Sequence, residues 1–172
     1  MDSDHFHTLW LRSVHLEPRD GDVRIAEAKQ IHAAVPLGQR ALIAGDFNSI
    51  TSRRSPAGGE PQPDFNKVPA GRRYHTGAWP PDTPNGDTMA DTRALDYLID
   101  CGWRCQHMAD GNTTPTTLPG WERGGAVIID RCLATAGLET VPDSVWVDTS
   151  TTPYSDHRAF GGAVSFSARS TA

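Results

Sequence analysis

The sequence predicts an α+β domain built from short elements joined by many ordered loops, and three observations predict this class. The chain has 172 residues, which is enough for one domain with a buried core. Hydrophobic residues make up 37% of it, and 16 glycines with 13 prolines favour short elements over a helical bundle. Short apolar runs of strand length alternate with segments that have the period of a helix.

The first third of the chain has the pattern strand, helix, strand. Residues 7–16 alternate in polarity as a strand does. After a turn, Asp20 or Asp22 can cap a helix that ends before Gly38. The apolar face of this helix comprises Ile25, Ala28, Ile31 and Val35. The run 41–44 is short and wholly apolar, which predicts a buried strand.

The remaining elements lie beyond a long loop. Residues 50–87 are rich in Pro and Gly without clear periodicity, and a loop of that length in a compact domain is usually functional or mobile. Thr88 and Asp91 resemble a capping box for a helix that ends at Gly102. The segments that we expect to form strands after it are 103–108, 126–129, 145–147 and 162–168.

Charge and cysteine content exclude several classes of protein. The 21 acidic and 16 basic residues give a net charge of −5, so no general field attracts nucleic acid or an anionic membrane. We see no transmembrane run and no signal peptide, and we therefore expect a cytoplasmic location. An odd number of cysteines argues against a disulfide framework. We expect the three to be small core residues: Cys101, Cys105 and Cys132.

One part of the long loop is basic within this acidic chain. Four arginines are candidates to bind a phosphate-bearing substrate: Arg53, Arg54, Arg72 and Arg73. They are accompanied by Lys67 and opposed by Glu60 and Asp64. The planar guanidinium group suits phosphate oxygens better than an ammonium group does. A solvated loop with no binding role is the alternative interpretation.

Two polar residues follow the buried run 41–44 directly. Because strand side chains alternate, Asp46 and Asn48 lie on one side of the strand end. Metal-assisted attack on a phosphate needs such a pair, with a carboxylate to orient water or bind the cation and an amide to donate to an oxygen. A plain turn is the alternative, since both residue types favour turns.

Further polar groups stand at the ends of other predicted strands, far away in the sequence. They are His15, Asp130 and the pair Asp156–His157. Two carboxylates near one point would attract Mg²⁺, which prefers oxygen ligands. A histidine beside a buried aspartate can be oriented by it as a base is. Asp130 could instead form a structural ion pair with Arg131 or Arg158.

These motifs, in this order, resemble those of the endonuclease/exonuclease/phosphatase superfamily, which has the DNase I-like fold. The motifs are Val14-His15-Leu16, Gly45-Asp46-Phe47-Asn48, Ile129-Asp130-Arg131 and Ser155-Asp156-His157. Thr114-Pro115-Thr116, which precedes the third motif, is also similar to the family. The resemblance extends from about Leu9 to Phe166 and implies a four-layer α/β/β/α sandwich.

The resemblance implies a metal-dependent phosphodiesterase or phosphomonoesterase that uses Mg²⁺ or Mn²⁺. By this analogy Asp46 orients or deprotonates the attacking water, and Asn48 holds a non-bridging phosphate oxygen. Asp156 is expected as a metal ligand or as a carboxylate behind one, together with Asp46 and Asn48. Phosphoryl chemistry of this kind is accelerated chiefly by positioning and electrostatics.

The resemblance also implies the roles of the histidines. His157 would contact the phosphate, and Asp130 would hold its ring. His15 would bind the phosphate or support departure of the leaving oxygen. The substrates served by the superfamily range from DNA and RNA to phospholipids and small phosphate esters, so the class of ester stays open, nucleic acid included.

The chain departs from the family at its start. Members carry about half a domain before the histidine strand, and that half supplies an early Asn and the Glu that is the principal Mg²⁺ ligand. We therefore expect a single domain over residues 1–172 that is N-terminally truncated relative to the family, with an incomplete sandwich. The alternative to an enzyme is a non-catalytic or partner-dependent half-domain, which would associate with itself or another chain through an exposed sheet edge or face.

Overall fold

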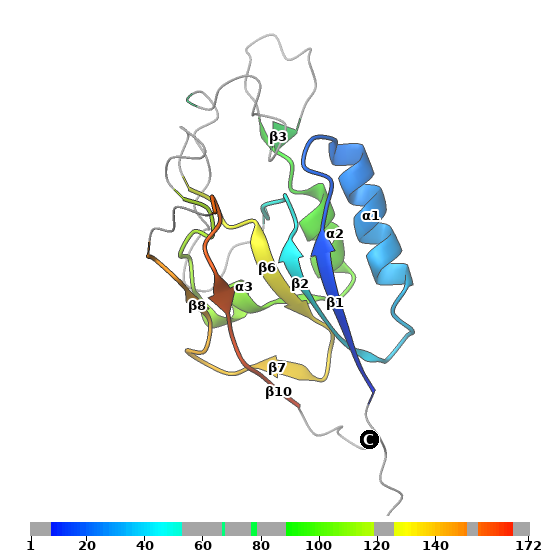
Figure 1. Cartoon of the computed structure of the whole chain (residues 1–172). Helices are drawn as coiled ribbons and strands as arrows, with labels where there is room; N and C mark the ends of the chain where they lie inside the picture. The colour runs from blue at the N-terminus through cyan, green and yellow to red at the C-terminus, as the bar shows by residue number, and fades with distance from the viewer. Residues whose placement is uncertain are drawn as a thin grey trace, which may run out of the picture.

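The chain folds around one four-stranded mixed sheet (Figure 1). The computed structural model describes residues 8–52, 67, 77–78, 89–118, 126–150 and 155–166. The sheet has the order β1-β2-β6-β5. Its strands are β1 (Leu9–His15), β2 (Arg40–Asp46), β6 (Asp130–Ala134) and β5 (Arg104–Cys105). β1 and β2 are parallel, whereas β6 is antiparallel to both β2 and β5. The prediction of mixed α and β structure is thus confirmed.

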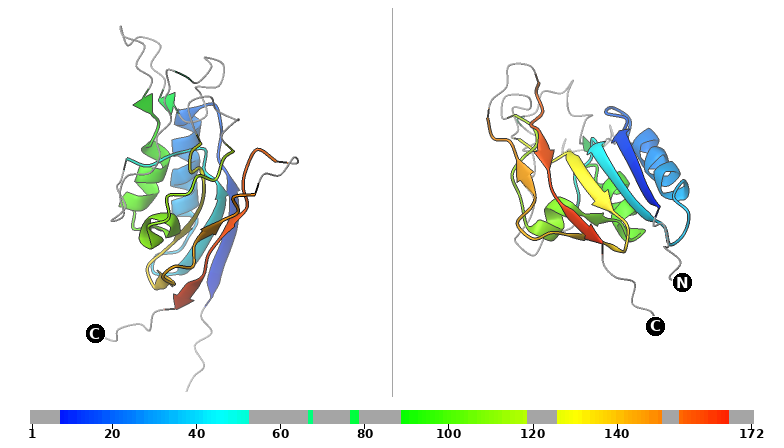
Figure 2. Two further views of the ribbon diagram at one scale, coloured as in Figure 1. Left: turned by 90° about the vertical axis from the view of Figure 1, so that its left-hand side faces the viewer. Right: turned by 60° about the horizontal axis from the view of Figure 1, so that its bottom comes forward.

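Two helices cover one face of this sheet, as Figure 2 shows in its left view. They are α1 (Gly21–Ala33) and α2 (Arg93–Asp100). α1 begins where the sequence predicts, because Asp20 accepts hydrogen bonds from the backbone N–H groups of Asp22 and Val23. The main core lies between these helices and the sheet and includes Ile31, Ile43, Phe47, Leu95, Leu98, Trp103 and Leu133. This core fixes the sheet whose ends carry the polar motifs.

Three small antiparallel sheets and a short helix complete the described fold. β3 (Gly77–Ala78) pairs with β4 (Met89–Ala90), β7 (Leu138–Thr140) with β10 (Val164–Phe166), and β8 (Trp146–Val147) with β9 (Phe160–Gly161). The helix α3 (Gln106–Asp110) follows β5 directly and ends at Gly111, whose φ of 75° is in the left-handed region. Of the cysteines, Cys105 is buried, Cys101 and Cys132 are half-buried, and all three are free.

The strand predicted at 126–129 is wrong. Residues 127–129 are buried and Ala126 is half-buried, but none of them pairs in a ladder, and the strand β6 begins only at Asp130. The run is held by a loop instead, because the N–H groups of Thr116 and Thr117 both donate to the carbonyl of Val127. An apolar run shows that a segment is buried, but it does not show which partner takes its backbone hydrogen bonds.

Three other boundaries differ from the sequence-based expectation. In the predicted strand 103–108 only Arg104–Cys105 is extended, and α3 takes the rest. The predicted strand 162–168 is shorter, since β10 covers Val164–Phe166, and residues 167–168 lie outside the described residues. α2 has Thr92 as its N-cap, while Thr88 lies outside the described residues. Short runs and chain turns are where periodicity discriminates least.

β1 is the edge strand of the four-stranded sheet in the described structure. Its Leu11 side chain is 69% exposed, so the strand presents apolar surface as well as unpaired backbone groups. Within the described ranges, the helices are too short or too polar to cross a membrane.

Candidate functional site

The register of three strands brings three motif residues into one row. β1 and β2 are parallel, so both strands terminate at the same end of the sheet, and the antiparallel β6 begins at that end (Figure 1). His15 pairs with Asp46, and Asp46 pairs with Asp130. Paired residues on adjacent strands direct their side chains to the same face. The row is therefore a consequence of register and not of proximity in the sequence.

His157 reaches this row from a separate turn. The backbone of His157 forms an antiparallel bridge with Thr117. Its ring Nδ1 lies 2.8 Å from Oδ2 of Asp130, and its Nε2 lies 3.9 Å from Oδ2 of Asp46. One carboxylate thus holds the ring, and the other faces its opposite nitrogen. We call Asp46, Asp130 and His157 the strand-end cluster.

The strand-end cluster raises the pKa of both Asp46 and His157 above their ordinary values. Burial raises the pKa of Asp46, and the negative charge of Asp130 raises it further, although the N–H of Asn48 opposes this. The hydrogen bond to Asp130 raises the pKa of His157, with the charge of Asp46 adding to the effect against partial burial. The site therefore favours positive charge, either on the imidazole or on a bound cation.

A divalent cation fits the donor set of this cluster. Asp46, Asp130 and His157 each offer a ligand atom, and these atoms lie within 4.8 Å of one another. Two carboxylate oxygens and one imidazole nitrogen suit Mn²⁺ or Mg²⁺ with further water ligands. A cation would also relieve the unfavourable charge that raises the pKa of Asp46. Among the described residues, this is the group of three that meets the spacing.

Asn48 lies beneath the cluster and shapes its turn. Its N–H donates to Oδ1 of Asp46 at 2.8 Å, and its side-chain amide donates to the carbonyl of Leu16 at 2.9 Å. The residue is buried and has a φ of 44°, a left-handed conformation that Asn tolerates. Gly45 has a φ of 144°, and a Cβ there would lie 1.9 Å from the carbonyl oxygen of Val14. The turn thus requires both residue types.

Two further candidates lie at the rim of the cluster. Nε2 of His15 is 3.7 Å from Oδ2 of Asp46, and the His15 side chain is 73% exposed. Oδ1 of Asp156 is 3.9 Å from Nε2 of His157, on a side chain that is 51% exposed. Neither belongs to the group of atoms within metal-binding distance of one another. The four candidate arginines of the long loop, Arg53, Arg54, Arg72 and Arg73, lie outside the described residues.

Thr116 is a residue whose contacts the sequence did not reveal. Its hydroxyl oxygen accepts hydrogen bonds from the N–H groups of Ile129 and Asp130, both at 3.1 Å. The similarity of Thr114-Pro115-Thr116 to the family marks the segment but assigns it no role. The backbone partner of a threonine hydroxyl cannot be read from a sequence, because it depends on how distant segments meet.

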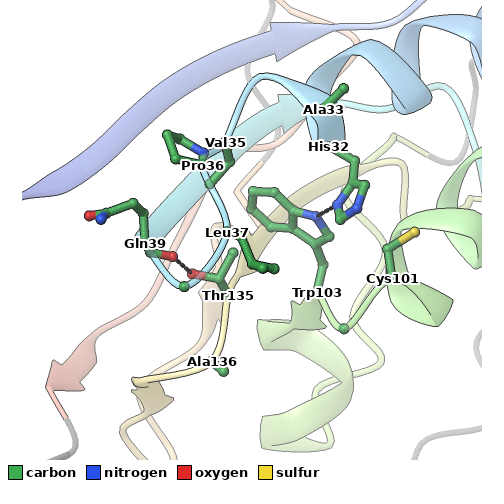
Figure 3. A pocket seen from close by; sticks show the side chains of 12 residues that line it. His32, Ala33, Val35, Pro36, Leu37, Gln39, Cys101, Trp103, Thr135 and Ala136 are labelled. Carbon is green, nitrogen blue, oxygen red and sulfur yellow. Dashed lines mark hydrogen bonds between the residues drawn. The ribbon is translucent and has the colours of Figure 1, made fainter.

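A pocket lies elsewhere, away from the strand-end cluster. It has a volume of about 510 Å³ and is formed by the loops that follow α1, α2 and β6 (Figure 3). These loops lie where β2 begins and β6 ends, so the pocket is at the opposite end of these strands from the strand-end cluster. Within it Trp103 donates its indole N–H to Nδ1 of His32 at 3.2 Å. Its lining contains no carboxylate, so it has no counterpart to Asp46 and Asp130.

Comparison with known proteins adds distant structural similarity. No family model and no curated protein matches the chain. A solved structure that is similar is the mannosyl-6-phosphatase Bt3783 of Bacteroides thetaiotaomicron VPI-5482, with a TM-score of 0.48 and 12% sequence identity. The similarity covers 90% of this chain and 50% of that one, so the chain spans about half its length. The function is accordingly argued from the site and the sequence motifs.

Proposed function

We propose that the chain is a metal-dependent phosphoesterase whose reaction centre is the strand-end cluster. The observation that carries this proposal is the position of His157 between two carboxylates, 2.8 Å from Asp130 and 3.9 Å from Asp46. Such a set combines a proton acceptor, a group that becomes a cation and a place for a metal ion. The order of the sequence motifs supports the same chemistry, as does the DNase I-like sandwich that they imply.

Asp46 is the proposed base that orients and deprotonates the attacking water. Its raised pKa makes it a stronger proton acceptor than an ordinary aspartate. The N–H of Asn48 holds Oδ1, which leaves Oδ2 directed at the nitrogens of His157 and His15. A phosphate group would lie among these atoms, with its oxygens beside the imidazoles and water beside the carboxylate.

His157 and Asp130 act as an oriented pair in this proposal. Because Asp130 accepts from Nδ1, the ring is fixed and Nε2 faces the space above Asp46. The raised pKa of His157 favours the imidazolium form, which would donate to a phosphate oxygen and stabilise developing negative charge. His15, exposed at the rim, is placed to bind the phosphate or to assist the leaving oxygen.

Mg²⁺ or Mn²⁺ is the proposed cofactor, with the carboxylates of Asp46 and Asp130 as the groups that would hold it and Asp156 at its rim, while the His157 ring faces the phosphate. When bound, a divalent ion supplies charge neutralisation at the phosphate oxygens. The remaining chemistry belongs to the chain itself, which positions the base and the imidazolium.

Hydrolysis of model esters tests the proposal. The full chain is assayed with bis-p-nitrophenyl phosphate, p-nitrophenyl phosphate and single-stranded DNA, each with Mg²⁺, with Mn²⁺ and with a chelator. We expect turnover of at least one ester with a divalent ion and loss of about 100-fold or more in Asp46→Ala and His157→Ala. Removing either the base or the imidazole should abolish most of the rate acceleration, because both groups act in the same step.

Asp20→Asn is the matched control for removing a carboxylate. It keeps the helix cap, because Asn caps as well as Asp does, and Asp20 lies outside the cluster. Its turnover should equal that of the original chain. Absence of turnover from every ester with either metal ion would contradict the enzyme proposal and favour the partner-dependent half-domain.

A further inference from the structure

Thr116 joins the segments that carry the strand-end cluster. Its side chain is fully buried, and its hydroxyl oxygen accepts hydrogen bonds from two successive N–H groups, those of Ile129 and Asp130. In a regular strand successive N–H groups point in opposite directions. Here they converge on one oxygen, as in the backbone nests that bind anions. The hydroxyl therefore stands at the point where the chain enters β6 at Asp130.

The backbone of the same segment holds the turn that carries His157. The carbonyl of Thr116 accepts from the N–H of Arg158 at 2.6 Å, and Leu118 donates its N–H to the carbonyl of Asp156 at 3.0 Å. The two neighbours of His157 are thus hydrogen-bonded to the two neighbours of Thr117. Thr117 itself forms a β-bridge with His157. The separation between Asp130 and His157 is set by one short segment that touches both.

A third connection runs to the turn that carries Asp46. The N–H of Ile129 is bonded to the Thr116 hydroxyl, and the carbonyl of Ile129 accepts from the N–H of Phe47 at 2.9 Å. Phe47 is the residue directly after Asp46. Displacement of Ile129 would consequently move the turn of Asp46 as well as the start of β6.

We propose that Thr116 is a positioning residue that fixes Asp130 against His157 through its hydroxyl, an inference that rests on the proposed hydrolytic role of the cluster. Without the hydroxyl, two N–H groups in a buried region lose their acceptor. The start of β6 would then shift to find other partners, and the 2.8 Å contact between Asp130 and His157 would lengthen. Removing a group that orients a metal ligand through a hydrogen bond typically lowers metal affinity or activity by about 10- to 100-fold.

Thr116→Val tests the role of the hydroxyl in the full chain without depending on any substrate. The first measurement is the downfield NMR signal of the hydrogen-bonded Nδ1 proton of His157, assigned by its loss in His157→Gln, in metal-free protein. The second is Mn²⁺ binding by isothermal titration. We expect Thr116→Val to lose the signal and to bind Mn²⁺ about 10- to 100-fold more weakly, and Thr116→Ser to restore both.

Thr135→Val is the matched control. The hydroxyl of Thr135 also accepts a hydrogen bond from a strand N–H, that of Ala41 at 2.8 Å, but it lies at the other end of the strands from the strand-end cluster. This variant should keep both the signal and the Mn²⁺ affinity. If Thr116→Val does not fold, Thr116→Cys replaces it, since sulfur of similar size is a weaker acceptor and should weaken both readouts.

Two results would overturn the inference. One is a folded Thr116→Val that retains the His157 signal and the Mn²⁺ affinity, and the other is equal loss of both in Thr135→Val. Neither measurement requires turnover, so failure of the hydrolysis assay and failure of the positioning role are separate outcomes.

Discussion

The molecule contains two clusters of charged side chains that differ in their balance of acidic and basic groups. The first is the strand-end cluster of Asp46, Asp130 and His157. The second, which we call the helix cluster, joins α1 to the start of α2 and comprises Asp22, Arg24, Asp91 and Arg93. Arg24 and Asp91 are buried and lie 3.0 Å apart, and Nε of Arg93 lies 2.9 Å from the other oxygen of Asp91. The helix cluster contains its own cations, whereas the strand-end cluster has two carboxylates and one imidazole.

The pKa directions of the buried Asp91 and the half-buried Asp46 express this difference. Burial alone raises the pKa of both. For Asp91 the hydrogen bonds of Arg93 and the charge of Arg24 outweigh burial, and the pKa falls below its ordinary value. For Asp46 burial prevails, reinforced by Asp130, and the pKa rises. A carboxylate with resident guanidinium partners stabilises a fold, and one without them is suited to accept a proton or a cation.

Removing one partner in each cluster should give the largest contrast. Arg24→Met removes one of the two guanidinium partners of the buried Asp91. Losing one partner of a buried pair costs about 3–5 kcal/mol of unfolding free energy, and the remaining contact with Arg93 places this variant at the lower end. Asp46→Asn removes a charge that Asp130 and burial both disfavour, so stability should be unchanged or higher. Urea unfolding at pH 7 with a chelator measures both.

The control for this contrast is Lys29→Met, which removes an exposed cation from the same helix. It should cost about 1 kcal/mol or less, because the contact of Lys29 with the Tyr97 ring, 5.9 Å from Nζ to the centroid, is made by an exposed cation. Equal destabilisation by Arg24→Met and Asp46→Asn would show that the two clusters do not differ as we describe.

The dependence of stability on pH should have opposite signs at the two aspartates. Between pH 3.8 and the raised pKa of Asp46, the folded state binds more protons than the unfolded state, so stability falls as pH rises through that window. The Asp91 carboxylate has a lower pKa in the folded state than in the unfolded state. Below pH 3.8 the unfolded state therefore binds more protons at this group, and stability falls as pH is lowered toward the depressed pKa.

Urea unfolding without metal ions, repeated from pH 3 upward, measures these slopes at intervals of about half a unit. Asp46→Asn should remove the loss between pH 3.8 and the raised pKa of Asp46 and leave the acid loss in place. An Asp46→Asn protein whose stability still falls across the upper window by the original amount would contradict the assignment to Asp46. This effect is smaller than that of Arg24→Met, because it reports the protonation of one group and breaks no buried ion pair.

The smallest effect is expected at the rim of the helix cluster. Arg93 also contacts Asp22 at 2.7 Å, but the Asp22 side chain is 85% exposed. Exposed pairs contribute about 0–1 kcal/mol, so Asp22→Ala should change thermal stability little, and less still in high salt. A loss as large as that of Arg24→Met would mean that the whole network, and not the buried pair, holds the helices together.

Sequence reasoning succeeded where local signals were strong. The alternating strand, the cap at Asp20 and the apolar run 41–44 all correspond to β1, α1 and β2. It failed at 126–129, where an equally apolar run is held by backbone bonds to Thr116 and Thr117. Both runs are buried, and composition cannot distinguish a segment that finds a strand partner from one that finds a loop.

The candidate site shows the same division. The residue types and the order of the motifs nominated Asp46, Asp130 and His157 from the sequence. The sequence did not indicate that Asn48 would donate to Leu16 from a buried position, or that His15 and Asp156 would lie at the rim. Hydrogen-bond partners of this kind depend on which distant segments meet, and such meetings are absent from local patterns.

The sequence by itself determined the chemistry available to this protein, because side-chain type sets what can bind metal, accept a proton or hold a phosphate. It also determined the strands and helices whose periodicity is long enough to be unambiguous. The tertiary structure alone decided which carboxylate is balanced by arginine and which is not. The reason is physical: the charge that surrounds a buried group, and hence its pKa, comes from residues that folding brings near, such as Arg24 to Asp91 and Asp130 to Asp46.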